Sequence, residues 1–174
     1  MTTTSPPGAK SPAVPLSTAN MKPEDLLALQ TTARNALADG HSLAEKLGVS
    51  ADEIKARFSA VGGLCDKGQF TQALPGALDL LLLLPGDWRS SFLVGSCLQR
   101  LNRPAEALPF YSWVLAQSGL PVAQLRIGEC HSAVGETDAA LEAFLDALAS
   151  TEEADPVHKL ATTAAKPLLA TAAH

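Results

Sequence analysis

Three consecutive residues, Glu129, Cys130 and His131, are the residue types from which a thiol nucleophile is built. Adjacent residues of a helix point about 100° apart, so these three side chains cannot share one site. Cys130 also lies 33 positions after Cys97, in a chain that repeats at about that spacing, and a small buried residue is expected there. We therefore predict a structural cysteine, no catalytic residue and no enzyme.

Metal and phosphate chemistry have little support in the sequence. No glycine-rich phosphate loop is present. Three widely spaced cysteines, an odd number without a C-x-x-C pair, are typical of a reducing compartment such as the cytoplasm. We expect no metal and no cofactor, because no spacing typical of metal ligands separates the four histidines, His41, His131, His158 and His174.

The chemistry that remains is binding, and it depends on a stretch that recurs along the chain. Residues 88–119 have the pattern of two amphipathic helices joined by a turn at Asn102. Gly95 in the first of these helices is matched by Gly128, 33 residues later, and by Val61, 34 residues earlier. The same pair of helices is therefore expected three times.

Two further sets of positions keep this spacing. The turn residue Asn102 corresponds to Gly68 and Gly135, and these residue types adopt a positive φ at low cost where a helix ends. A period near 34 with such features is the pattern of a tetratricopeptide array. Chance self-similarity in a chain rich in Ala and Leu is the alternative. The other matched positions are Ala73, Ala107 and Ala140, and then Ala77, Tyr111 and Phe144.

We predict an all-α fold, with three tetratricopeptide repeats in a short right-handed superhelix between an N-terminal helical extension and a C-terminal capping helix. Residues 1–23 are rich in Pro, Ser and Thr and are expected to be disordered. The other predicted segments are N-terminal helices over 24–49, the array over 50–152 with repeats at 54–87, 88–120 and 121–152, and the capping helix over 155–173.

Local signals indicate where several helices begin. Ser42 and Ser50 are each followed three residues later by Glu, which is the capping-box pattern. Thr137 is expected to cap the second helix of repeat three. Pro75 and Pro109 occupy equivalent places in two second helices, where they indicate a late start or a kink.

The segment before the array contains a candidate dimerisation helix. It is predicted to begin near Pro23 and to end at Gly40. Because this helix is separate from the array, its apolar stripe is a candidate for packing against a second subunit. The predicted dimer-interface residues are Leu26, Leu27, Leu29, Ala33 and Leu37.

An array of this kind turns one face of each repeat's first helix inward. Positions 2, 5, 9 and 12 of those helices share that face and mix apolar with hydrogen-bonding side chains, a mixture that suits an extended peptide. Packing between helices is the alternative for the apolar members, whereas Gln99 has no evident packing role. The predicted peptide-binding residues are Phe58, Gly62, Cys65, Arg89, Phe92, Ser96, Gln99, Leu125 and Glu129.

Composition excludes other classes of partner. A net charge of −5 and a pI near 5.3 argue against nucleic-acid binding. The apolar run over 80–84 is too short to span a bilayer, and no secretory leader is evident, so we expect no membrane insertion. The segment 129–155 contains eight acidic residues and no Lys or Arg. It either orients a charged partner or is a solvated helical surface.

Several short motifs follow one another along the chain: Ser42-Leu43-Ala44 with Val49-Ser50, Lys67-Gly68-Gln69-Phe70-x-x-Ala73, Gly95-Ser96-Cys97-x-Gln99 and Glu129-Cys130. In this order they resemble one family, the class II (translocator) chaperones of bacterial type III secretion systems. The resemblance covers about residues 40–150 and implies a small, acidic, cytoplasmic, all-helical chaperone that is often dimeric through its N-terminal helices. It further implies that an extended segment of a secreted translocator protein is gripped in a concave groove.

The sequence departs from this family at one place and leaves a second function open. The family commonly has aromatic residues on the first helix of repeat one, where Phe58 is followed here by the small residues Gly62 and Cys65. We expect an enlarged pocket there. The alternative function is a generic tetratricopeptide adaptor that bridges soluble proteins, such as components of a secretion apparatus.

Overall fold

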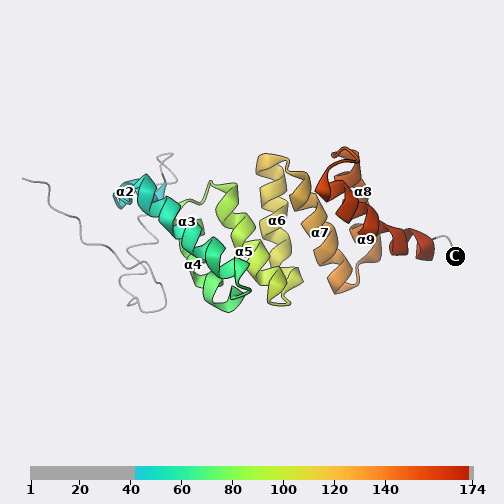
Figure 1. Cartoon of the computed structure of the whole chain (residues 1–174), viewed down its shortest axis with the longest axis horizontal. Helices are drawn as coiled ribbons and strands as arrows, with labels where there is room; N and C mark the ends of the chain where they lie inside the picture. The colour runs from blue at the N-terminus through green and yellow to red at the C-terminus, as the bar shows by residue number, and fades with distance from the viewer. Residues whose placement is uncertain (1–41, 173–174) are drawn as a thin grey trace, which may run out of the picture.

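The computed structural model describes residues 42–172, which form a row of helices that follow one another in chain order (Figure 1). No β-strand occurs in these residues, and the predicted all-α tetratricopeptide fold is confirmed. The helices are α2 (Leu43–Lys46), α3 (Ala51–Asp66), α4 (Phe70–Leu83), α5 (Trp88–Arg100), α6 (Pro104–Ser118), α7 (Pro121–Val134), α8 (Thr137–Ala149) and α9 (Pro156–Ala172).

Each helix from α3 onward packs against the next one along the chain, and α9 also contacts α7. The pairs α3 with α4, α5 with α6, and α7 with α8 are the three expected hairpins. Contacts between nearest neighbours are what makes such an array almost one-dimensional, so each repeat is held mainly by the repeats beside it.

The turn inside each hairpin has the same backbone conformation. Gly68, Asn102 and Gly135 have φ values of 72°, 60° and 84°, all in the left-handed region. The residue types that matched in the sequence therefore match because the backbone requires a positive φ at the end of each first helix.

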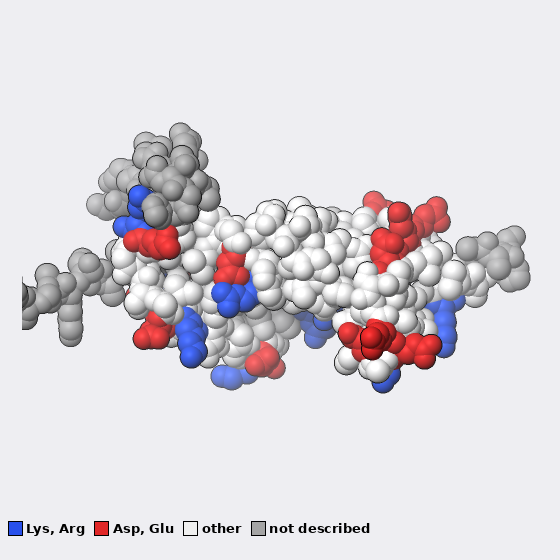
Figure 2. Space-filling model, turned by 90° about the horizontal axis from the view of Figure 1, so that it is seen from above, with Lys and Arg blue, Asp and Glu red and all other residues white. Residues whose placement is uncertain are grey.

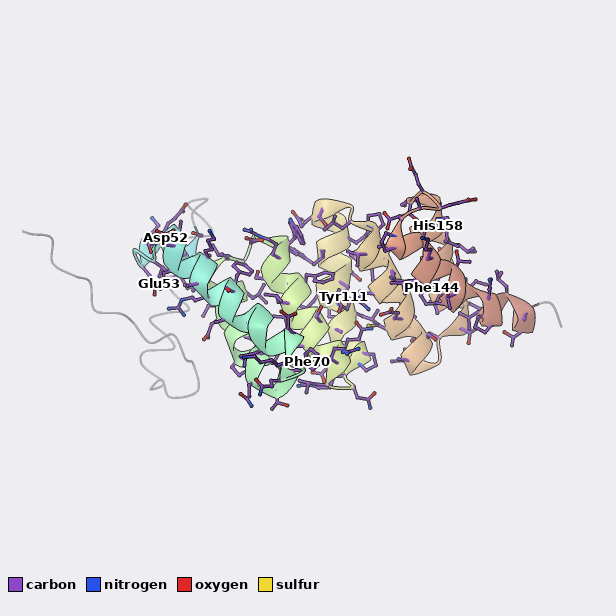
Figure 3. All side chains as sticks on the ribbon, in the orientation of Figure 1. Asp52, Glu53, Phe70, Tyr111, Phe144 and His158 are labelled. Atoms are coloured by element: carbon purple, nitrogen blue, oxygen red, sulfur yellow. The ribbon has the colours of Figure 1, made fainter. Side chains whose placement is uncertain are left out.

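Within the second hairpin and within the third, a glycine of the first helix lies against an aromatic ring of the second helix. Figure 3 labels these rings, Tyr111 and Phe144. A β-carbon added to Gly95 would lie 3.0 Å from the Tyr111 ring, and one added to Gly128 would lie 2.6 Å from the Phe144 ring. In the first hairpin the small residue is on the other helix, because a β-carbon on Gly76 would lie 2.8 Å from Val61. Repeat one can therefore have Val61 where repeats two and three have Gly95 and Gly128, because Gly76 provides the space on the second helix.

The buried residues of the array form separate clusters. The largest contains Val61, Leu80, Val94 and Tyr111 of repeats one and two and extends to Ile127 in repeat three. A second cluster joins repeat three to α9 and is built around Phe144. In this way α9 covers apolar surface of α7 and α8, as a capping helix does.

Helix starts follow the local signals in part. Ser42 and Glu45 form a reciprocal capping box, and the Ser50 hydroxyl accepts a hydrogen bond from the Glu53 backbone N–H at 3.2 Å. Thr137 does not cap α8; it is the first helical residue, and the capping position is held by Glu136 without a side-chain hydrogen bond.

The late start predicted from Pro75 and Pro109 is wrong. The helices begin earlier, at Phe70 and Pro104, and continue through these prolines. Pro104 itself opens α6, at a position where its missing N–H would have no helical partner.

Acidic side chains gather toward the C-terminal end of the described chain (Figure 2). The arginines of the middle, by contrast, are mostly paired: Arg89 with Asp87, Arg103 with Glu106, and Arg126 with Glu129. The middle of the array is therefore less basic than its arginine content indicates.

Among residues 42–172, none of the helices has both the length and the apolar character that a bilayer crossing needs.

Candidate peptide-binding site

Predicted site residues on the three first helices meet across the gaps between repeats. The Arg89 guanidinium of α5 lies 5.1 Å from the centre of the Phe58 ring of α3, and Gln99 of α5 is hydrogen-bonded to Glu129 of α7. The predicted residues are therefore neighbours across three repeats. We call this surface the first-helix face and define it by Phe58, Arg89, Phe92, Ser96, Gln99 and Glu129.

A cavity of about 580 Å³ opens at the N-terminal end of the first-helix face. Phe58 and Ile54 of α3 line it together with apolar residues of α2 and of two loops, and the basic residues Lys55 and Arg89 are balanced there by two acidic ones. Such a combination accepts an apolar side chain while leaving polar groups for the backbone beside it. The other lining residues are Ser42, Ala44, Glu45, Val49, Ala51, Leu84 and Asp87.

Arg89 is held at the cavity by the residue that begins its own helix. Asp87 caps α5 by accepting a hydrogen bond from the Arg89 backbone N–H at 2.9 Å, and its carboxylate also pairs with the guanidinium. The hydrogen bonds from the Arg89 side chain hold the pKa of Asp87 below its ordinary value. The Arg89 side chain is nevertheless 60% exposed and is available to a ligand.

Farther along the face, a polar network crosses from repeat two to repeat three. The buried Tyr111 hydroxyl donates to Gln99 Oε1 at 2.9 Å and lies 3.3 Å from Ser96 Oγ. Gln99 Nε2 donates to Glu129 Oε2 at 2.8 Å, and Arg126 Nη1 donates to the same oxygen at 2.7 Å. Burial raises the pKa of Tyr111 to about 12, so this hydroxyl stays a donor at neutral pH.

This network corrects the interpretation of Gln99. The sequence suggested no packing role for it, yet its amide joins Tyr111 of α6 to Glu129 of α7. Tyr111 and Arg126 were missed as site residues. Arg126 precedes Glu129 by three positions on the same helix, a spacing at which opposite charges pair, and this was the one available signal.

The aromatic members of the face are half-buried and contact the core as well as the surface. The Phe92 ring packs edge-on against Tyr111, with centroids 5.5 Å apart and an interplanar angle of 67°. Phe58 lines the cavity and also packs against the main cluster. Each of these side chains is thus anchored from behind while part of it stays accessible.

Leu125 does not belong to the site. Its side chain is only 1% exposed and packs in the cluster formed with Phe144 and Ala161. The prediction that Leu125 anchors a peptide is therefore wrong, and the packing alternative is correct. The C-terminal helix supplies the reason, because Ala161 of α9 belongs to the cluster that buries this leucine.

The two small residues of α3 differ from each other. A β-carbon on Gly62 would meet no atom within 4 Å, so space is open there. Cys65, in contrast, contacts Cys97 of α5 with the two sulfurs 3.8 Å apart. Neither residue lines the cavity, which lies nearer the start of α3 at Ile54 and Phe58. Open space thus lies beside Gly62 but not beside Cys65, and the enlarged pocket stays a prediction.

The cysteines of α5 and α7 have the environment of structural residues. Cys97 and Cys130 are fully buried, and burial raises the pKa of Cys97 to about 12 and that of Cys130 to about 11. A protonated buried thiol is a poor nucleophile at neutral pH.

The predicted dimer-interface residues, at positions 26–37, and the segment 1–23 lie outside the described residues.

The three hairpins and the contacts between their first helices define a tetratricopeptide-repeat protein. No protein-family model and no curated protein sequence matches the chain. Several solved structures are similar to it. A type III secretion complex from Aeromonas hydrophila matches with a TM-score of 0.73 and 22% identity, over 80% of this chain and 96% of that one.

Structures of chaperones are among them. PcrH, a protein of Pseudomonas aeruginosa, in complex with the chaperone-binding region of PopD, matches with a TM-score of 0.64 and 28% identity, over 72% of this chain and 96% of that one. The translocator chaperone SycD of Yersinia enterocolitica matches with a TM-score of 0.64 and 21% identity, over 74% and 97%. The resemblance to the class II translocator chaperones of type III secretion, predicted from sequence motifs, is thus confirmed.

Proposed function

We propose that this protein is a type III secretion chaperone that binds an extended segment of a translocator protein on its first-helix face and keeps it soluble and competent for export. The observation that carries the proposal is the similarity to PcrH, at 28% identity over 72% of the chain, in a structure where PcrH is bound to the chaperone-binding region of PopD. PcrH is also known in complex with the corresponding region of PopB.

The chemistry of the face supports an extended peptide as the ligand. Phe58 and the cavity beside it provide an apolar pocket, and Arg89 provides exposed donors at its rim. Farther along, Glu129 and Arg126 are half-buried polar groups with oxygen and nitrogen atoms available for hydrogen bonds. Alternating pockets and polar groups match the period of an extended chain, whose side chains alternate while its backbone needs partners.

Two accompanying proposals follow from the family and concern the whole protein. We place it in the bacterial cytoplasm, where a secreted client is held before export. We also retain the homodimer formed through Leu26, Leu27, Leu29, Ala33 and Leu37 as a proposal. Removal of residues 1–39 is expected to lower the molar mass in sedimentation equilibrium to that of one chain, and an unchanged association state would refute this interface.

Co-expression tests the proposed function. With a type III translocator encoded in the same genome, the protein is expected to move the client from the insoluble to the soluble fraction and to co-purify with it. An adaptor would instead bind termini of proteins that are already soluble and would leave client solubility unchanged. The second result would replace the proposal by the adaptor function.

Variants at the cavity test whether the first-helix face is the binding surface. Phe58→Ala is expected to weaken client binding about tenfold, since one well-packed aromatic anchor contributes on the order of 1–2 kcal/mol. Leu169→Ala, which truncates an exposed apolar residue of α9, is the matched control and should bind normally.

A charge reversal keeps this test informative if Phe58→Ala lowers stability. Arg89→Glu changes a residue whose side chain is 60% exposed, so it should weaken binding while the loss of its ion pair with Asp87 lowers the free energy of unfolding by no more than about 1 kcal/mol. Lys159→Glu makes the same reversal on an exposed part of α9. If the α3 and α5 variants bind as tightly as the two controls, the client does not use this face.

A further inference from the structure

Cys65 and Cys97 form a pair of thiols between the first helices of repeats one and two. Their sulfur atoms are 3.8 Å apart, which is van der Waals contact between side chains from α3 and α5. Cys65 is half-buried, whereas Cys97 is fully buried. The two cysteines are thus arranged as an accessible thiol with a second thiol directly behind it.

We propose that Cys65 and Cys97 are an oxidation site at which an intramolecular disulfide forms and joins repeat one to repeat two. The oxidant is a small disulfide such as oxidised glutathione; because the cytoplasm keeps thiols reduced, the bond forms there only when oxidised glutathione accumulates. The Cys65 thiolate attacks one sulfur of the oxidant and releases one glutathione thiol. The Cys97 thiolate then attacks Cys65 Sγ and releases the second. Two protein thiols and one glutathione disulfide become one protein disulfide and two glutathione thiols, so atoms and electrons balance.

The order of these two steps follows from burial. Cys65 is the member of the pair that solvent reaches, so it meets the oxidant first. Cys97 is shielded from an external oxidant but lies against the sulfur of its partner. Once Cys65 is part of a mixed disulfide, the second attack is intramolecular, and the effective concentration of the buried thiol offsets its low thiolate content.

The surroundings of Cys65 allow the approach that a covalent bond requires. The sulfurs must close from 3.8 Å to about 2.05 Å. Gly62 and Gly63 lie one turn or less before Cys65, and a β-carbon on either would meet no atom within 4 Å. A glycine pair with open space beside it lets the end of α3 adjust more easily than a packed helix would.

Formation of this bond would connect two repeats that are otherwise held by packing alone at this point. The link would close a loop that contains all of α4 and most of α5. It would fix the C-terminal end of α3 against α5. The helix α3 carries Phe58, and α5 carries Arg89 and Phe92. This oxidation involves the two thiols alone and requires no client.

Peptide mapping tests the proposal with the full chain. The protein is treated with oxidised glutathione under native conditions, remaining thiols are alkylated, and the product is digested with trypsin. Cleavage after Lys and Arg separates the cysteines into peptides 58–67, 90–100 and 127–159. The expected product is peptide 58–67 linked to 90–100, with Cys130 alkylated and the protein still migrating as a single chain on a non-reducing gel.

Cysteine variants provide matched controls. Cys130→Ser should form the same linked peptide and leave no free thiol, whereas Cys65→Ser and Cys97→Ser should form none. Oxidised Cys130→Ser should also unfold several degrees above its reduced form, because the link restricts the unfolded chain. The proposal is overturned if Cys65 stops at the glutathione adduct, if Cys97 pairs with Cys130, or if the link joins two chains.

Discussion

A β-carbon added to Gly128 would lie 2.6 Å from the Phe144 ring, whereas one added to Gly62 would meet no atom within 4 Å. At the scale of single residues, the same substitution is therefore expected to have opposite effects. Gly128 allows close approach of α7 and α8, and Gly62 only weakens α3 as a helix.

Gly128→Ala is expected to lower the free energy of unfolding by about 2 kcal/mol, because the Phe144 ring is fully buried and cannot move away without strain. Gly62→Ala should raise it by about 0.5–1 kcal/mol, since alanine is the better helix former. Urea denaturation of the two variants and the unchanged protein measures both. Equal changes in the free energy of unfolding would show that the contact between Gly128 and Phe144 does not set the cost of the substitution.

At the scale of elements, the hairpin turns decide where first helices end. Asn102 is exposed and has a φ of 60°, a conformation that β-branched residues avoid. Gly68 and Gly135 hold the equivalent positions and are exposed too. Because no buried packing depends on these side chains, we expect the positive φ alone to determine which residue types fit there.

Asn102→Val is accordingly expected to lower the free energy of unfolding by about 1–2 kcal/mol, the cost of a left-handed conformation for a branched residue. Asn102→Gly is the matched control and should stay within about 0.5 kcal/mol of the unchanged protein. Thermal and chemical denaturation followed by circular dichroism at 222 nm, a wavelength at which helix content is read, measures the difference. Similar stability of the two variants would contradict this account of the turn.

At the scale of the whole molecule, two buried cysteine thiols that stay protonated make the free energy of unfolding depend on pH. Burial raises the pKa of Cys97 from 9.0 to about 12 and that of Cys130 from 9.0 to about 11. Below pH 9 both thiols are protonated in the folded and the unfolded chain and contribute no pH dependence. Above pH 9 the unfolded chain loses these protons first, so stability falls as the pH rises toward 11 and 12.

The free energy of unfolding is therefore expected to fall by about 1 kcal/mol for each of these thiols between pH 8 and pH 10. A reducing agent is kept present so that oxidation does not interfere. The double variant Cys97→Ala with Cys130→Ala should lose most of this decrease, while Tyr111, whose pKa is raised from 10.0 to about 12, adds its own decrease only above pH 10. A flat profile in the unchanged protein would contradict the burial of the two thiols.

The sequence by itself determined the all-α class, the three hairpins and their turns. These features depend on the period of apolar residues and on the backbone preferences of Gly68, Asn102 and Gly135, and both are local properties. The capping serines Ser42 and Ser50 were predictable for the same reason. That Phe58 and Arg89 lie on one face followed from the repeat register, which turns positions 2 and 5 of each first helix the same way.

Only the tertiary structure decided which residues of the first-helix face are exposed and which are buried or hydrogen-bonded to neighbouring helices. Leu125 has the position of a ligand anchor, but the second cluster, in which α9 takes part, buries it. Gln99 is engaged by the Tyr111 hydroxyl, which reaches it from α6. The Cys65–Cys97 contact likewise joins residues 32 positions apart. Such pairings depend on which side chains fill the space between packed helices, and periodicity along one chain carries no information about that.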